Sequence, residues 1–481
     1  MMADTAKHSE FIESSTSIAS TIVDWDDDND PARPMNWSTA RRWAIVVTTT
    51  LITFVVSFSS SVFSATLSDV ADEFDVSKNI AVLGITLFVL GFAFGPLLWG
   101  PASELYGRTL PLWLGYSAFL IFQLPLAISS EIRVILIFRF LAGLFGSAPL
   151  AIVAGMYVDF LNPMERGIAT SVFSVGVFCG PVMAPVLGNI ITEHLGWRWT
   201  GWITLFVGLF LGIICVVCTP ETADSILLQR KAQALRLETG NWALHAKSAE
   251  EPAYLRTFVE KYLTKPAKML VLEPILLIFT VYMSLVYGIL YLTLTMYPYS
   301  FHTVRKMTAI EASLPFLFLL TGIVLACLFL GLYSFYYVGR RLSAGKTLKP
   351  EDRLPPVILG SVLLPAGLFW FAWTSQTHMP WVLQAASGIF TGCGIILVFM
   401  SSISFLIEVY LYHANSALAI NTFVRSIIAA SFPVFSQKMM SNLGIEWTGT
   451  LLACICVILA PFPVVMLLYG SRVRGWSKFA R

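Results

Sequence analysis

Residues 80–99 read IAVLGITLFVLGFAFGPLLW, a predominantly apolar run without a charged side chain. An α-helix rises about 1.5 Å per residue, so a run of this length spans the roughly 30 Å of hydrocarbon in a bilayer. The run therefore predicts a membrane-spanning helix.

The same pattern recurs along the chain and divides it into two parts. The first group of predicted spans lies near 43–67, 80–99, 110–129, 134–157, 168–191 and 201–219. The second group lies near 272–296, 312–336, 356–374, 381–405, 415–437 and 449–469. Six spans, a polar break and six more spans are typical of two structural repeats. We therefore expect an all-α membrane protein with twelve transmembrane helices in two six-helix halves.

This pattern also predicts the domain boundaries. They are an N-terminal arm at 1–42, a first half at 43–219, a linker at 220–271, a second half at 272–470 and a tail at 471–481. Within the linker, residues 229–237 favour an amphipathic, basic helix on the membrane surface, and a plain solvated linker helix is the alternative.

Composition supports a membrane protein and excludes other classes. Of the 481 residues only 12% are charged, whereas soluble domains carry roughly 25%. A net charge of +2 without a basic, aromatic-rich tract predicts no nucleic-acid partner. The chain has no metal-binding cluster, no Gly-x-Ser-x-Gly elbow and no Gly-x-x-x-x-Gly-Lys-Ser/Thr loop, so we expect neither an enzyme nor an ATP-driven pump, and no cofactor.

All seven cysteines fall inside apolar stretches, where cysteine packs as a small hydrophobe. Cys215-x-x-Cys218 leaves a redox or metal pair as the alternative.

Positive charge predicts the orientation in the membrane. Of the 31 lysines and arginines, most lie in the arm, the linker and the other segments on the same side. Those predicted on the opposite side are Lys78, Arg133, Arg198, Arg305, Lys306 and Lys438. Because basic loops stay in the cytoplasm, we expect both termini to be cytoplasmic.

Two arginines, Arg139 and Arg425, lie inside predicted spans. A charge within a span is costly and usually faces a cavity or a partner. For Arg139 the alternative is a long side chain that snorkels to the interface. Asn421 lies one turn from Arg425, so an amide and a guanidinium share one helix face, either on the central cavity or fixing two helices together.

Other spans carry further candidate residues. Tyr287 and Tyr291 are one turn apart and can offer rings and hydroxyls to an amphiphilic ligand, or pack in the core or at the lipid interface. Glu408 follows an apolar run near the cytoplasmic end of the tenth span, and it is the best candidate for a proton carrier.

Small residues and prolines mark the fifth span: Gly176, Gly180, Pro181, Ala184, Pro185 and Gly188. They predict a flat packing face and a bend, followed by the polar Asn189, which faces the cavity or a helix neighbour.

The loop after the second span reads Gly100-Pro101-Ala102-Ser103-Glu104-Leu105-Tyr106-Gly107-Arg108. Gly107 suits a turn with unusual backbone angles, and Glu104 and Arg108 are spaced to engage helix ends. An ordinary interhelical turn is the alternative.

These nine residues resemble the signature loop of the major facilitator superfamily, although Thr109 stands where that loop has a basic residue. Residues 180–188 resemble the motif of its antiporter branch, with Ala184 in place of a usual glycine. Together with Asp159, Pro220-Glu221-Thr222 and Glu273-Pro274, they resemble the fungal twelve-span drug:proton antiporters, which include multidrug and polyamine exporters.

The resemblance implies alternating access by a monomer in the lipid bilayer, with a small-molecule substrate and protons as partners. It implies a role for Arg139 in substrate binding or proton coupling, and a gating role for Gly100, Glu104, Gly107 and Arg108. The plasma membrane is the expected location, and the vacuolar membrane is the alternative.

Three functions remain open on the sequence. The first is proton-coupled export of small amphiphilic compounds, either drugs or a toxic secondary metabolite. The second is transport of small organic acids such as dicarboxylates, since two arginines suit carboxylates and no acid lies at mid-depth in the first six spans. The third is a non-transporting membrane receptor, which the short arm and tail disfavour.

Overall fold

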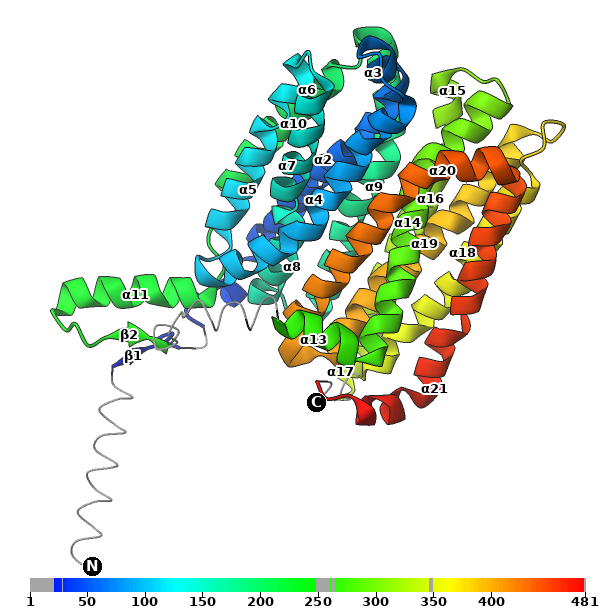
Figure 1. Ribbon diagram of the computed structural model, residues 1–481. Coiled ribbons are helices and arrows are strands. Elements are labelled where there is room, and N and C mark those ends of the chain that lie inside the picture. Colours follow the sequence, from blue (N-terminus) through cyan, green and yellow to red (C-terminus); the bar gives the residue numbers. More distant parts are fainter. Residues whose placement is uncertain (1–20, 28, 248–259, 261–263, 346–348, 480–481) are drawn as a thin grey trace, which may run out of the picture.

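A computed structural model describes residues 21–27, 29–247, 260, 264–345 and 349–479. Two bundles of long helices stand side by side (Figure 1), the first built from residues before the linker and the second from residues after it. One buried apolar cluster lies within the first bundle, and a larger one extends from the second bundle into the first. Side chains on the outside are also apolar, with Val217 81% and Ile458 75% exposed. An apolar exterior of this kind suits lipid rather than water.

The first bundle holds the helices of six long apolar segments. They are α2 (Thr39–Val62), η2 (Phe63–Thr66), α3 (Leu67–Glu73), α4 (Lys78–Leu105), α5 (Thr109–Ile121), α6 (Leu124–Ile128), α7 (Ile132–Gly146), α8 (Ala148–Phe160), α9 (Pro163–Leu195) and α10 (Trp199–Cys218). The predicted third and fourth spans each comprise two short helices, α5 with α6 and α7 with α8.

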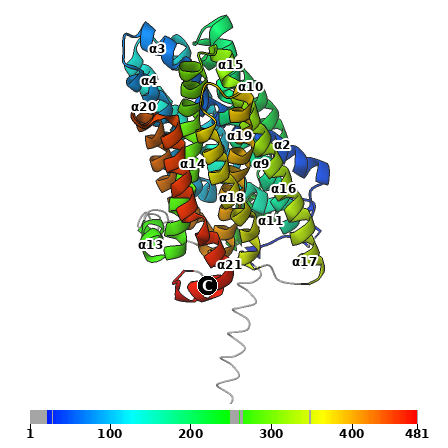
Figure 2. The same ribbon diagram turned by 90° about the vertical axis from the view of Figure 1, so that its right-hand side faces the viewer.

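The second bundle repeats this plan. Its elements are α13 (Lys265–Leu272), α14 (Pro274–Pro298), η5 (Tyr299–Val304), α15 (Ala309–Ser313), α16 (Pro315–Tyr333), η6 (Ser334–Val338), α17 (Gly339–Ser343), η7 (Pro350–Arg353), α18 (Leu354–Trp373), α19 (Trp381–Val409), η8 (Leu411–His413), α20 (Ala414–Leu459) and α21 (Pro461–Trp476). Figure 2 shows this bundle from its outer side.

The described residues contain eleven helical segments that are long and apolar enough to cross a membrane, where the sequence predicts twelve. The last segment, Ala414–Gly470, has 57 residues and would be about 85 Å long as one helix, far more than a bilayer needs. Gly444 has non-helical angles of φ 76° and ψ 171°, so two helices meet there. The predicted eleventh and twelfth spans lie on its two sides, and the chain reverses between them (Figure 1).

Both ends of the described chain lie at the same end of the bundles, together with α11 (Asp224–Thr239), α13, α17 and α21 (Figures 1 and 2). We name this the inner end, because the sequence predicts that it faces the cytoplasm. The opposite end, with α3, α6 and α15, is named the outer end.

The N-terminal arm packs on the linker helix α11. A short parallel pair joins β1 (Ile22–Val23) to β2 (His245–Ala246). Lys231 of α11 lies 2.7 Å from Asp26 and 3.5 Å from Asp30, so a basic residue of α11 meets the acidic arm. The arm also contains η1 (Pro34–Asn36). Parts of the predicted arm, linker and tail (1–20, 28, 248–259, 261–263, 480–481) lie outside the described residues.

Candidate functional site

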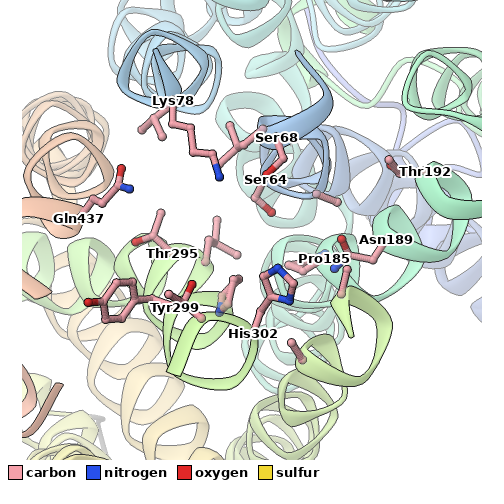
Figure 3. A pocket seen from close by; sticks show the side chains of 18 of the residues that line it. Ser64, Ser68, Lys78, Pro185, Asn189, Thr192, Thr295, Tyr299, His302 and Gln437 are labelled. Atoms are coloured by element: carbon pink, nitrogen blue, oxygen red, sulfur yellow. The ribbon is translucent and has the colours of Figure 1, made fainter. Parts of the chain in front are cut away.

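A cavity of about 550 Å³ opens between the two bundles at the outer end. It is bordered by η2, α3, α4 and α9 of the first bundle and by α14, η5, α15 and α20 of the second. Lys78, His302, Gln437 and the predicted candidate Asn189 are among its polar side chains, and Figure 3 shows them around the open space. Asn189 therefore faces the cavity, one of the two positions that the sequence left open.

A second cavity, of about 240 Å³, lies between the bundles toward the inner end. Tyr287, Phe399, Asn421 and Arg425 form part of its wall. At its inner rim lie Gly100, Glu104 and Arg108 of the predicted gating loop. The sequence placed Asn421 and Arg425 on one helix face, and the structure brings that face to this cavity.

One buried layer separates the two cavities. Along α14, Tyr287 lines the inner cavity, Thr295 lines the outer cavity, and Tyr291 lies between them and lines neither. The Tyr291 hydroxyl is 3.1 Å from the hydroxyl of Ser60 on α2, so this contact joins the two bundles. We name Ser60 and Tyr291 the central layer. Sequence reasoning did not single out Ser60, since nothing in its serine-rich surroundings marks it.

Arg139 does not line either cavity. Its guanidinium donates to three backbone carbonyls, from Nε to Gly84 at 2.9 Å, from Nη1 to Ser59 at 2.8 Å and from Nη2 to Ser60 at 3.0 Å. The side chain is 2% exposed and lies over the ring of Phe88 at 4.4 Å, so it does not snorkel.

The local course of α2 explains these bonds. The α-helix ends at Val62 and continues as a tighter 3-10 turn, so the carbonyls of Ser59 and Ser60 belong to its last turn. Carbonyls there lack intrahelical partners and carry the negative end of the helix dipole. Arg139 thus caps α2 and ties α7 to α2 and α4.

Arg425, unlike Arg139, is surrounded by aromatic rings rather than by backbone carbonyls. Its guanidinium lies 4.4 Å from the ring centre of Phe399 and 4.9 Å from that of Tyr287. The only hydrogen bond that the structure records for it is a 3.5 Å contact with the Thr422 hydroxyl, and its Nε is buried without a partner among the described residues. Asn421 donates to Thr280 at 3.0 Å, which joins α20 to α14, while its amide oxygen is buried and unpartnered within the described chain.

The predicted gating loop is organised by Glu221, which the sequence marks only as part of the family resemblance. Its carboxylate accepts the backbone N–H of Arg108 at 2.8 Å and the hydroxyl of Thr109 at 2.7 Å, at the N-terminus of α5. It also accepts the N–H groups of Thr222 and Ala223, both at 3.0 Å. Burial raises the pKa of Glu221, but hydrogen bonds from the backbone of Ala223 and Arg108 outweigh this, and its pKa is lowered.

Gly107 and Arg108 complete this arrangement. Gly107 has φ +86°, and a Cβ there would lie 2.5 Å from the carboxylate of Glu221. Arg108 forms an ion pair with Asp159 at 3.0 Å, and Thr109 bonds to Glu221 where the family's loop has a basic residue. The carboxylate at the helix N-terminus is thus that of Glu221, whereas Glu104 accepts a hydrogen bond from Asn415 of the other bundle at 2.7 Å.

The second bundle has a similar ion pair at the inner end. Glu408, near the end of α19, lies 2.7 Å from Arg353, which directly precedes α18. Its second oxygen is buried without a partner among the described residues. Glu408 lines neither of the two cavities. Arg353 and Glu408 occupy the places in this bundle that Arg108 and Asp159 occupy in the first.

The glycines of the fifth span pack α9 against α2. A Cβ on Gly176 would lie 2.7 Å from the carbonyl of Thr50, and one on Gly180 would lie 2.7 Å from the backbone nitrogen of Phe58. At Gly188 it would meet Ala65 at 2.8 Å. Ala184 is fully buried in the same contact, and Pro185 lines the outer cavity. Pro181 and Pro185 both lie inside α9.

The cysteine pair takes no visible part in a site. Cys215 lies 3.4 Å from the hydroxyl of Thr219, and all seven cysteines are free. In the part of the chain that the structure describes, no three His, Cys, Asp or Glu side chains gather to hold a metal ion.

The model of the Major Facilitator Superfamily matches residues 49–433. The chain belongs to this superfamily. It is therefore a multi-pass membrane protein and a transporter, as the sequence predicts, and not an enzyme.

Relatives along nearly the full chain are fungal transporters of this superfamily. The citrinin biosynthesis cluster transporter of Monascus ruber is 43% identical over 97% of this chain and 94% of its own length. The ascochitine biosynthesis cluster transporter of Didymella fabae is 41% identical over 96% of this chain and 90% of its own length.

Solved structures agree on the fold. The proton:xylose symporter XylE bound to 6-bromo-6-deoxy-D-glucose has a TM-score of 0.66 at 14% identity, over 90% of this chain and 96% of the symporter. XylE from E. coli in a partially occluded, inward-open conformation has a TM-score of 0.60 at 15% identity, over 89% of this chain and 99% of XylE. At such identities the likeness concerns the fold alone, and it agrees with the predicted major facilitator architecture.

Proposed function

We propose that this transporter is a proton-coupled exporter of small amphiphilic organic compounds. The observation that carries the proposal is the pair of cavities at opposite ends of one interface, with the central layer of Ser60 and Tyr291 between them. Two halves that rock about such a layer expose one cavity at a time, which is alternating access. Cargo enters the inner cavity from the cytoplasm and leaves through the outer cavity.

The relatives support a secondary metabolite as cargo, because two of them are named for the citrinin and ascochitine biosynthesis clusters. The walls of the inner cavity support an amphiphilic cargo, because aromatic rings lie beside Asn421 and Arg425. The organic-acid alternative uses both intramembrane arginines as a clamp for a dicarboxylate. It is not favoured, since Arg139 is already bonded to three carbonyls.

Glu408 remains the proposed proton carrier. The free oxygen of its carboxylate is buried, and its other oxygen holds Arg353 at the inner end. Protonation would neutralise the carboxylate and release Arg353, which couples the proton to the relative stability of two states of the carrier. The proposal also places both termini in the cytoplasm and a monomer in the plasma membrane, with the vacuolar membrane as the alternative.

Efflux from vesicles that contain the purified chain tests this function. A pH gradient is imposed, and labelled lipophilic toxins are compared with small dicarboxylates. The proposal predicts efflux of the amphiphiles that stops when the gradient is collapsed. Efflux that ignores the gradient, or selective movement of dicarboxylates, would contradict it.

A further inference from the structure

The charge of Arg425 is not balanced by the wall of the inner cavity. Within the described chain, the only other charged residues of that wall are Glu104 and Arg108. Glu104 binds Asn415, and Arg108 is paired with Asp159. Among the described residues, no salt bridge is recorded for Arg425, and two ring faces cover its guanidinium.

An unbalanced guanidinium is unusual in a low-dielectric interior. Buried charges are normally paired, because desolvation without a partner is costly. Arg139 follows this rule with its three carbonyls, and Arg425 does not. The partner of Arg425 is therefore best supplied by the cargo, since its side chain lines the space that the cargo would fill.

We propose that the inner cavity selects compact aromatic compounds that carry one acidic group. This inference rests on the proposed export function. The anionic oxygen accepts hydrogen bonds from Arg425, and the flat ring packs among Phe92, Tyr287 and Phe399. One turn nearer the inner end, the unpartnered amide oxygen of Asn421 accepts a hydroxyl hydrogen bond beside the acidic group.

The size of the cavity limits the body of the cargo. Its volume of about 240 Å³ equals that of roughly eight water molecules, which corresponds to one or two rings. A second carboxylate would find no second unpaired guanidinium among the described residues of the wall, because Arg139 lies outside the cavity wall and Arg108 is paired with Asp159. A cationic cargo is disfavoured, because the wall presents no unpaired carboxylate among the described residues.

The selectivity is measured by binding to the purified full chain. Labelled salicylate (2-hydroxybenzoate) is the probe, and its neutral analogue salicylamide and the cation benzylamine are the competitors. We expect salicylate to bind at least about tenfold more tightly than salicylamide, as hydrogen bonds to a charged group predict. We expect benzylamine not to compete.

Variants then assign this preference to one side chain. Arg425→Gln is expected to lower the ratio of salicylate affinity to salicylamide affinity to about one. Arg425→Lys is expected to keep part of this ratio, because lysine retains the positive charge but cannot bind a carboxylate with two parallel hydrogen bonds. Arg230→Gln, on the exposed face of α11, is the control and keeps the parental ratio. Thermal unfolding of each variant verifies folding.

Two results would overturn the inference. One is equal affinity of the parental chain for salicylate and salicylamide, which requires no variant. The other is an unchanged ratio in a folded Arg425→Gln variant. If gradient-driven efflux is found without charge preference, only this inference fails, whereas selective binding without gradient-driven efflux contradicts the proposed function alone.

Discussion

The hydroxyl of Tyr291 lies 3.1 Å from the hydroxyl of Ser60, and these two side chains join the halves of the transporter between its two cavities. Tyr291 is fully buried, and its hydroxyl also lies 3.5 Å from that of Tyr287. A small change in this contact should therefore alter how often the layer opens.

We predict that Tyr291→Phe makes the central layer open more often. A buried hydrogen bond between neutral groups contributes about 1 kcal/mol, which corresponds to roughly a fivefold shift between closed and open states. Labelling of a cysteine at Thr295, in the outer cavity, by a membrane-impermeant reagent added at the inner end measures how often the layer opens. An unchanged labelling rate would show that the contact does not hold the layer closed. Phe423→Leu, in a ring contact between the halves away from this layer, is a control for general loosening.

Arg139 should act on folding rather than on cargo. We predict that Arg139→Gln destabilises the protein by about 3 kcal/mol or more, because it removes charged hydrogen bonds to three buried carbonyls. Thermal unfolding in detergent measures this loss. The folded fraction should bind cargo with the parental affinity, and a large loss of affinity at parental stability would instead make Arg139 a cargo ligand.

Sequence and structure agree on elements that depend on local patterns. The run at 80–99 is helical throughout, Gly107 takes the positive φ that its position suggests, and Gly180 lies where a helix backbone passes closely. Helix length and turn geometry depend on neighbouring residues alone, and the spacing of small residues on α9 marks a packing face without specifying which helix packs on it.

The candidate site was less predictable, because its contacts join distant residues. Arg139 and Arg425 look alike in the sequence, but α2 ends beside the first and only rings cover the second. The Ser60–Tyr291 contact spans 231 residues, and Glu221 bonds to Arg108 across 113 residues. No local pattern specifies such partners.

The glycine face of α9 gives a test of close packing. We predict that Gly180→Val destabilises the protein by about 1–3 kcal/mol or prevents folding, because the new side chain meets the backbone of Phe54 and Phe58. Gly331→Val is the matched control, since nothing lies within 4 Å of a Cβ there. Expression and thermal unfolding are compared, and equal tolerance of both changes would contradict the packing model.

Glu221 should stabilise the loop only while it is ionised. Its folded-state pKa is lowered, so its contribution is complete above the unfolded pKa near 4.5 and is lost as pH falls through the folded value. We predict that the difference in Tm between the parental chain and Glu221→Gln is constant from about pH 6 to pH 8 and shrinks below about pH 4.5. A difference that changes between pH 6 and pH 8 would make Glu221, rather than Glu408, the group that titrates during transport.

Glu408 is the remaining link between the structure and proton coupling. Its ion pair with Arg353 resembles that of Asp159 with Arg108. Of these two carboxylates, only that of Glu408 has a buried oxygen without a partner among the described residues. We predict that Glu408→Gln reduces gradient-driven efflux about tenfold or more, because the amide cannot release and recapture a proton. Exchange of cargo across the membrane without a gradient should continue, since that step needs no net proton movement.

Asp159→Asn is the matched control for loss of an ion pair at the inner end, and it should slow both processes equally. Efflux by Glu408→Gln at the parental rate with the parental pH dependence would exclude Glu408 as the proton carrier.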